Sequence, residues 1–70
     1  MKHYYINNNI SNPNNNNEVH TEDCKYLPSS SNRTYLGYFS DCIAAVADAK
    51  AKGFFKADGC IHCCSEAHTE

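Results

Sequence analysis

The sequence predicts a small α+β domain, in which a three-stranded antiparallel sheet packs against one main helix and the chain ends in a cysteine knuckle or short helix. Three observations indicate this class: short β-favouring runs on both sides of an asparagine-rich stretch, an alanine-rich segment with helical spacing, and a Cys-x-x-Cys step near the C-terminus. A chain of 70 residues has room for one core, so we expect a single domain over residues 1–70.

Three short strands are expected in order along the chain. The first, His3–Asn8, begins with two tyrosines and an isoleucine and enters the stretch 7–17. We expect 7–17 to be a polar loop, because asparagine favours turns and its one proline lacks an amide donor. The loop allows the second strand, Glu18–Thr21, to pair antiparallel with the first. The third, Thr34–Phe39, contains a glycine at position 37, which indicates a bulge or a close backbone approach.

The main helix is expected at Cys42–Lys52. Ser40 is the predicted N-cap and Gly53 the predicted terminator. Helical spacing places one apolar stripe toward the sheet, and we expect its cysteine to be a small buried core residue. The two phenylalanines after the helix should close over the core. The stripe consists of Cys42, Val46 and Ala49, and the phenylalanines are Phe54 and Phe55.

The charge balance argues against a general nucleic-acid binder, because six Lys and Arg stand against eight Asp and Glu. Between Lys25 and Lys56, however, five bases face only two acids. This local excess of positive charge favours the binding of a partner, either a protein or a nucleic acid, to the basic side chains. The predicted partner-binding residues are Arg33, Lys50, Lys52 and Lys56.

The class of protein is bounded further by what the sequence lacks. No apolar run is long enough for a signal-peptide core or a membrane helix, so we expect a cytoplasmic protein without a membrane partner. In that compartment the five cysteines are expected to be reduced rather than joined in a disulfide framework. Because the chain is short, it offers little volume for a substrate pocket. We therefore expect that the protein is not an enzyme and has no small-molecule substrate.

Two spaced pairs of soft ligands carry the chemistry of the sequence. Cys60 and Cys63 form a Cys-x-x-Cys step after a predicted Asp58-Gly59 turn, and His20 stands four residues before Cys24. Together they supply the four donors of one tetrahedral zinc ion. An extended chain would hold His20 and Cys24 roughly 13 Å apart, so the second strand must end near residue 21. Otherwise the fourth ligand should be His68 or Cys64.

These motifs resemble the Ada-type metal-binding domain over roughly residues 19–64. The resemblance implies one zinc ion held by the two pairs, in a domain that often accompanies DNA-handling proteins. The chain is also similar to a group of short bacterial proteins, a likeness that implies no function. The Ada-type pattern usually has cysteine at the first ligand and basic residues inside the last pair. The motifs compared are Val19-His20-x-x-x-Cys24, the strand with Tyr35 and Phe39, the alanine-rich helix and Gly59-Cys60-Ile61-His62-Cys63.

The sequence leaves three functions open. The first is a zinc-stabilised binding module in which the metal is structural. The second is a metal-free small domain with buried cysteines. The third is a thiol redox protein that uses Cys60, Cys63 and Cys64, although its Cys-x-x-Cys step lacks the βαβ setting typical of redox motifs.

Overall fold

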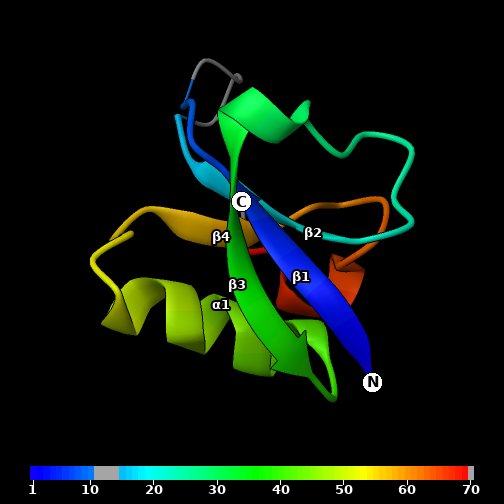
Figure 1. Ribbon diagram of the computed structural model, residues 1–70. Coiled ribbons are helices and arrows are strands. Elements are labelled where there is room, and N and C mark those ends of the chain that lie inside the picture. Colours follow the sequence, from blue (N-terminus) through cyan, green and yellow to red (C-terminus); the bar gives the residue numbers. More distant parts are fainter. Residues whose placement is uncertain (11–14, 70) are drawn as a thin grey trace.

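The computed structural model describes residues 1–10 and 15–69, and in this part of the chain a four-stranded sheet is covered on one face by a single α-helix (Figure 1). The predicted α+β class is confirmed. Residues 11–14 of the predicted polar loop lie outside the described residues. The elements are β1 (Lys2–Asn7), β2 (Asn17–Thr21), η1 (Ser30–Asn32), β3 (Arg33–Phe39), α1 (Cys42–Ala51), β4 (Ala57–Gly59) and η2 (Ser65–Ala67), where η marks a 3-10 turn.

The strand order is β3-β1-β2-β4, with β1 antiparallel to both β2 and β3. The predicted antiparallel arrangement is therefore right for three strands, but a fourth strand was missed. Residues Asp58 and Gly59, expected to form a turn, belong to β4, which runs parallel to β2. Backbone hydrogen bonds fix this pairing, from Asn17 N to Lys56 O (3.0 Å) and from Cys60 N to Val19 O (3.0 Å).

The predicted bulge at Gly37 is present. The register between β1 and β3 shifts between Tyr4 and Tyr5, so that Tyr4 faces Gly37 and Tyr5 faces Tyr35. Gly37 has a φ of 141°, which glycine adopts more readily than other residues. The extra residue, Leu36, is buried in the core.

Helix α1 starts at Cys42 as predicted and packs its predicted apolar stripe against the sheet, but its N-cap and one of the two phenylalanines after it differ from expectation. The N-cap is Asp41, because its carboxylate accepts a hydrogen bond from Ala44 N at 2.9 Å, and Ser40 does not serve. Phe54 packs against the core as expected, whereas Phe55 is 85% exposed. The core consists of Cys42, Ala45, Val46 and Ala49 of α1, with Tyr4, Ile6, Val19, Leu36, Ala57 and Cys64.

A disulfide joins Cys42, the first residue of α1, to Cys64 near the C-terminus. Cys42 is buried as predicted, but the expectation that it is a free thiol, and that the cysteines are all reduced, is wrong. The reason lies in the packing: the start of α1 and the turn after β4 meet in the core, which brings the two Cα atoms to 5.5 Å, within the range that a disulfide spans. Within residues 1–10 and 15–69 no helix is long and apolar enough to cross a membrane.

Candidate metal centre

The parallel pairing of β2 and β4 brings the two predicted ligand pairs to one place. His20 lies near the end of β2, and Cys60 follows β4 directly. Neighbouring parallel strands point the same way, so the segments that leave them start side by side. The hydrogen bond from Cys60 N to Val19 O fixes Cys60 next to the residue before His20.

The first pair is closed by the tight turn that the sequence required. Strand β2 ends at Thr21, and Cys24 N donates to Thr21 O at 3.2 Å. Glu22 N donates to His3 O, which anchors the turn to β1. The chain therefore reverses between His20 and Cys24, and both side chains reach one point.

The second pair lies on a turn of its own. Cys64 N donates to Cys60 O at 2.7 Å, which closes the segment that carries Cys60 and Cys63. The disulfide from Cys64 to Cys42 then fastens the end of this turn to α1. The turn is thus held at one end by the sheet and at the other by the helix.

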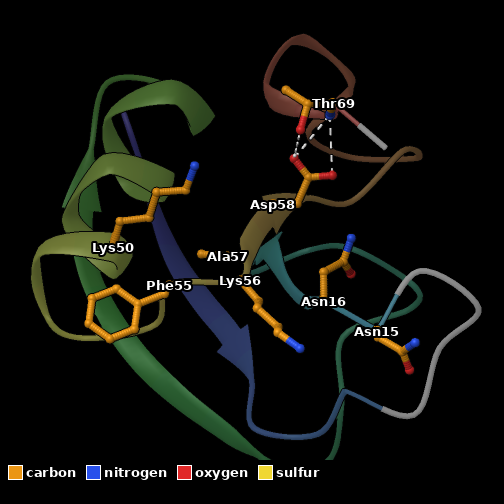
Figure 2. A pocket seen from close by; sticks show the side chains of 8 residues that line it. All are labelled: Asn15, Asn16, Lys50, Phe55, Lys56, Ala57, Asp58 and Thr69. Carbon is orange, nitrogen blue, oxygen red and sulfur yellow. Dashed lines mark hydrogen bonds between the residues drawn. The ribbon is translucent and has the colours of Figure 1, made fainter.

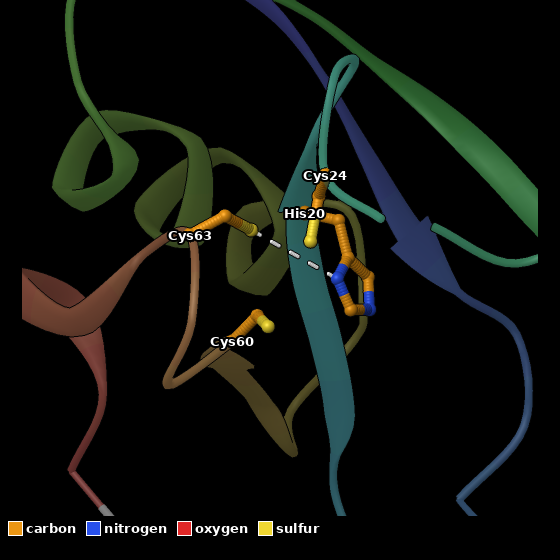
Figure 3. A group of neighbouring side chains, drawn as sticks. All are labelled: His20, Cys24, Cys60 and Cys63. Atoms are coloured by element: carbon orange, nitrogen blue, oxygen red, sulfur yellow. Dashed lines mark hydrogen bonds between the residues drawn. The ribbon is translucent and has the colours of Figure 1, made fainter. Parts of the chain in front are cut away.

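Four side chains converge between these two turns (Figure 3). The imidazole of His20 and the thiols of Cys24, Cys60 and Cys63 each offer one donor atom, and these atoms all lie within 4.8 Å of one another. Cys63 Sγ lies 3.9 Å from His20 Nδ1 and accepts a hydrogen bond from Thr21 N at 3.4 Å. Zinc bound at about 2.3 Å to sulfur places its donors roughly 4 Å apart, so the group is close to the size of a zinc site.

Burial shifts the pKa of two of the donors, His20 and Cys63, toward the neutral form. It lowers the pKa of His20, which is 1% exposed, and leaves a neutral imidazole with a free lone pair. Burial also raises the pKa of the Cys63 thiol to about 12, with a nearby hydrogen bond to Cys24 adding to the effect. A bound cation would reverse the balance at Cys63, because a metal ligand binds as the thiolate.

Glu18 lies beside the histidine, a neighbour that the sequence reasoning missed. Its Oε1 lies 3.7 Å from His20 Nε2, the ring nitrogen that faces away from the thiols. This carboxylate favours the tautomer with the proton on Nε2, which leaves Nδ1 free for an ion. The signal was present in the sequence, since residues 18 and 20 of a strand share one face.

Neither reserve ligand joins the group. Cys64 is bonded to Cys42, so its sulfur has no thiolate to offer. The Nδ1 atom of His68 lies 2.9 Å from Gly59 O and 3.3 Å from Asp58 Oδ2, and it helps to hold the C-terminal segment on β4. The tail is a 3-10 turn over η2 rather than a full helix.

The four predicted partner-binding residues do not form one surface. Arg33 stacks on the ring of Tyr5 at 4.6 Å, on the sheet face opposite α1. Lys52 pairs with Asp48 at 2.7 Å and donates to Leu36 O. Lys50 and Lys56 line a pocket of about 240 Å³ beside the exposed Phe55, together with residues that include Asp58 and Thr69 (Figure 2).

Comparison with known proteins gives no relative: no family model, no curated protein and no solved structure matches this chain. The likeness of residues 19–64 to the Ada-type domain therefore stays a prediction. The chemistry of the site rests on its own geometry, a partly buried group of three thiols and one imidazole.

Proposed function

We propose that the domain binds one zinc ion through His20, Cys24, Cys60 and Cys63. The observation that carries the proposal is the approach of four donor atoms to within 4.8 Å from two separate turns. Three thiolates with one imidazole are a usual donor set of structural zinc sites. Soft thiolate ligands also disfavour magnesium and calcium, which prefer oxygen.

The ion would be structural, and the domain a binding module rather than an enzyme. Four protein donors fill the tetrahedral positions of zinc and leave none for water or substrate, which a catalytic zinc requires. The ion also connects the turn after β2 with the turn after β4. We therefore infer that zinc holds together the end of the sheet where the two parallel strands stop.

Native mass spectrometry of the purified chain should show one zinc ion per domain. His20→Ala and Cys24→Ser should each abolish stoichiometric zinc, because three donors hold the ion far more weakly than four. Glu18→Gln should keep the ion but lower its affinity about tenfold, since the carboxylate only orients His20. Competition with a zinc chelator measures these affinities.

His62→Ala is the matched control. This histidine lies on the same turn as Cys60 and Cys63 but is exposed and stacks on Tyr26. Its loss should leave the zinc content at one ion per domain. A folded wild-type chain with no bound metal would contradict the zinc proposal and favour the metal-free domain.

We propose further that a negatively charged partner docks beside the end of α1. Lys50 and Lys56 make no ion pair within the described part of the chain, and they flank Phe55, an aromatic ring that the fold leaves 85% exposed. Two exposed lysines next to an exposed ring favour contact with an anionic, partly apolar surface, although the buried Asp58 lines the same pocket. Nucleic acid is the partner we test.

Single-stranded and duplex DNA should bind at low salt and be released as salt rises, because phosphate contacts displace condensed counterions. Lys50→Ala/Lys56→Ala should weaken this binding at least tenfold, as two phosphate contacts are lost. Arg33→Ala, on the opposite sheet face, is the control and should change it little. Fluorescence anisotropy at two salt concentrations measures the effect. No binding at low salt would exclude nucleic acid and point to an acidic protein segment.

A further inference from the structure

The four donors of the metal centre differ in their access to solvent. His20 and Cys60 are 1% and 2% exposed, whereas Cys24 and Cys63 are only partly buried. Both of the accessible cysteines line one cavity of about 340 Å³ that opens at the surface. A small molecule entering this cavity therefore meets two of the three sulfur donors and not the third.

Two lysines and one aspartate line the cavity, so its wall carries one net positive charge. Lys2 and Lys25 belong to the wall, and Lys2 pairs with Asp23 at 3.0 Å. The stacked rings of Tyr26 and His62, 4.4 Å apart, form another part of the wall. Such a cavity admits a small polar molecule, and its net positive charge stabilises negative charge that develops on a leaving group.

The other cysteines are poorly placed to react. Cys42 and Cys64 are already joined to each other and buried, so neither offers a thiolate. Cys60 is buried and does not line the cavity. The two accessible sulfur atoms, in contrast, lie within 4.8 Å of each other, so a modest movement brings them to bonding distance.

On the basis of the zinc site proposed above, we propose that Cys24 and Cys63 are a modification site for a hydroperoxide, which converts them to a disulfide and releases the ion. With hydrogen peroxide, one thiolate attacks a peroxide oxygen, the S–O bond of a sulfenic acid forms as the O–O bond breaks, and the other oxygen leaves as hydroxide. The second thiolate attacks that sulfur, the S–S bond forms, and a second hydroxide leaves. The peroxide gains two electrons, the two thiolates lose them, and two protons taken up from the buffered solution convert both hydroxides to water.

Loss of zinc follows from the same step. The disulfide removes two of the four donors and leaves only His20 and Cys60, a set too small to hold zinc in a closed tetrahedral site. The metal centre would thus report the presence of peroxide by releasing its ion. The new bond would join the same two turns that the ion had connected.

The test uses the full chain with its zinc content measured first. Hydrogen peroxide is added, released zinc is followed with a chromogenic indicator, and disulfides are mapped by peptide mass spectrometry after the free thiols are alkylated. We expect one equivalent of zinc to be released, with the loss of two hydrogen masses and a new Cys24–Cys63 link beside Cys42–Cys64. The rate of release should rise in proportion to peroxide concentration.

The outcomes separate this inference from the zinc proposal. A chain that holds no zinc before peroxide is added overturns the zinc site itself, and this inference falls with it. A zinc-loaded chain that keeps its ion in peroxide, or that forms a link containing Cys60, overturns the peroxide site alone. His62→Ala keeps all four donors and should still form the Cys24–Cys63 disulfide. Failure of this variant to form that disulfide would also contradict the proposal.

Discussion

Removing the zinc ion should unfold the domain, whereas removing the Cys42–Cys64 disulfide alone should leave the zinc-loaded domain folded. In small zinc-stabilised domains the binding of the ion contributes about 10 kcal/mol to folding. A disulfide between residues separated by 22 positions contributes about 3 kcal/mol. Domains of this size have a net stability of about 5 kcal/mol, so the first loss exceeds the stability and the second does not.

Four samples make this comparison: wild type and Cys42→Ala/Cys64→Ala, each with zinc and after chelation. Circular dichroism reports the fold, and amide hydrogen exchange reports the β2–β4 pairing, where protection should disappear on chelation. The double variant with zinc is the control for the disulfide. If Cys60 N and Asn17 N exchange slowly in chelated wild type, the ion is not structural.

Gly59→Ala should lower the free energy of unfolding of the zinc-loaded domain by about 3 kcal/mol. A Cβ atom at this position would lie 2.5 Å from Cys64 O and 2.9 Å from the carbonyl carbon of Ala67. Both neighbours are backbone atoms, so no side-chain rotation relieves the contact. The turn that carries Cys60 and Cys63 must move away from β4, and we expect weaker zinc binding as well. Denaturant unfolding and chelator competition measure the two effects.

Gly53→Ala is the control that distinguishes the cost of a steric clash from the cost of an unfavourable backbone conformation. A Cβ atom on Gly53 meets nothing within 4 Å, but its φ of 104° strains a residue with a side chain. This variant should lose only about 1 to 2 kcal/mol and keep the zinc affinity of wild type. Equal losses in the two variants, or an unchanged zinc affinity in Gly59→Ala, would contradict the packing account.

The disulfide shows that two of the cysteines have a structural role that the sequence does not predict. The expectation of reduced thiols rested on the absence of an export signal in the printed sequence, and Cys42 was correctly placed in the core on helical spacing. Its partner is not predicted from the sequence, because Cys64 is assigned there as an alternative metal ligand. A disulfide requires the two cysteines to lie close together, and only the packing of α1 against the turn after β4 brings them to that distance.

The local elements were determined by the sequence. Alanine-rich composition and Gly53 gave α1 to within one residue at its C-terminal end, and the aromatic runs gave β1 and β3. The polar residues of positions 21–23 predicted the turn that brings Cys24 back toward His20. These features depend on residues a few positions apart, whose backbone preferences and side-chain spacing are readable along the chain.

The tertiary structure alone decided how the two ligand pairs meet. His20 and Cys63 are 43 residues apart, and no spacing rule relates them. They meet because β4, three residues of low β-propensity, is held beside β2 by backbone hydrogen bonds and by burial under α1. The union of Cys42 with Cys64, 22 positions apart, has the same origin. Each depends on contacts between distant segments, whose free energy exists only once the sheet and helix have packed.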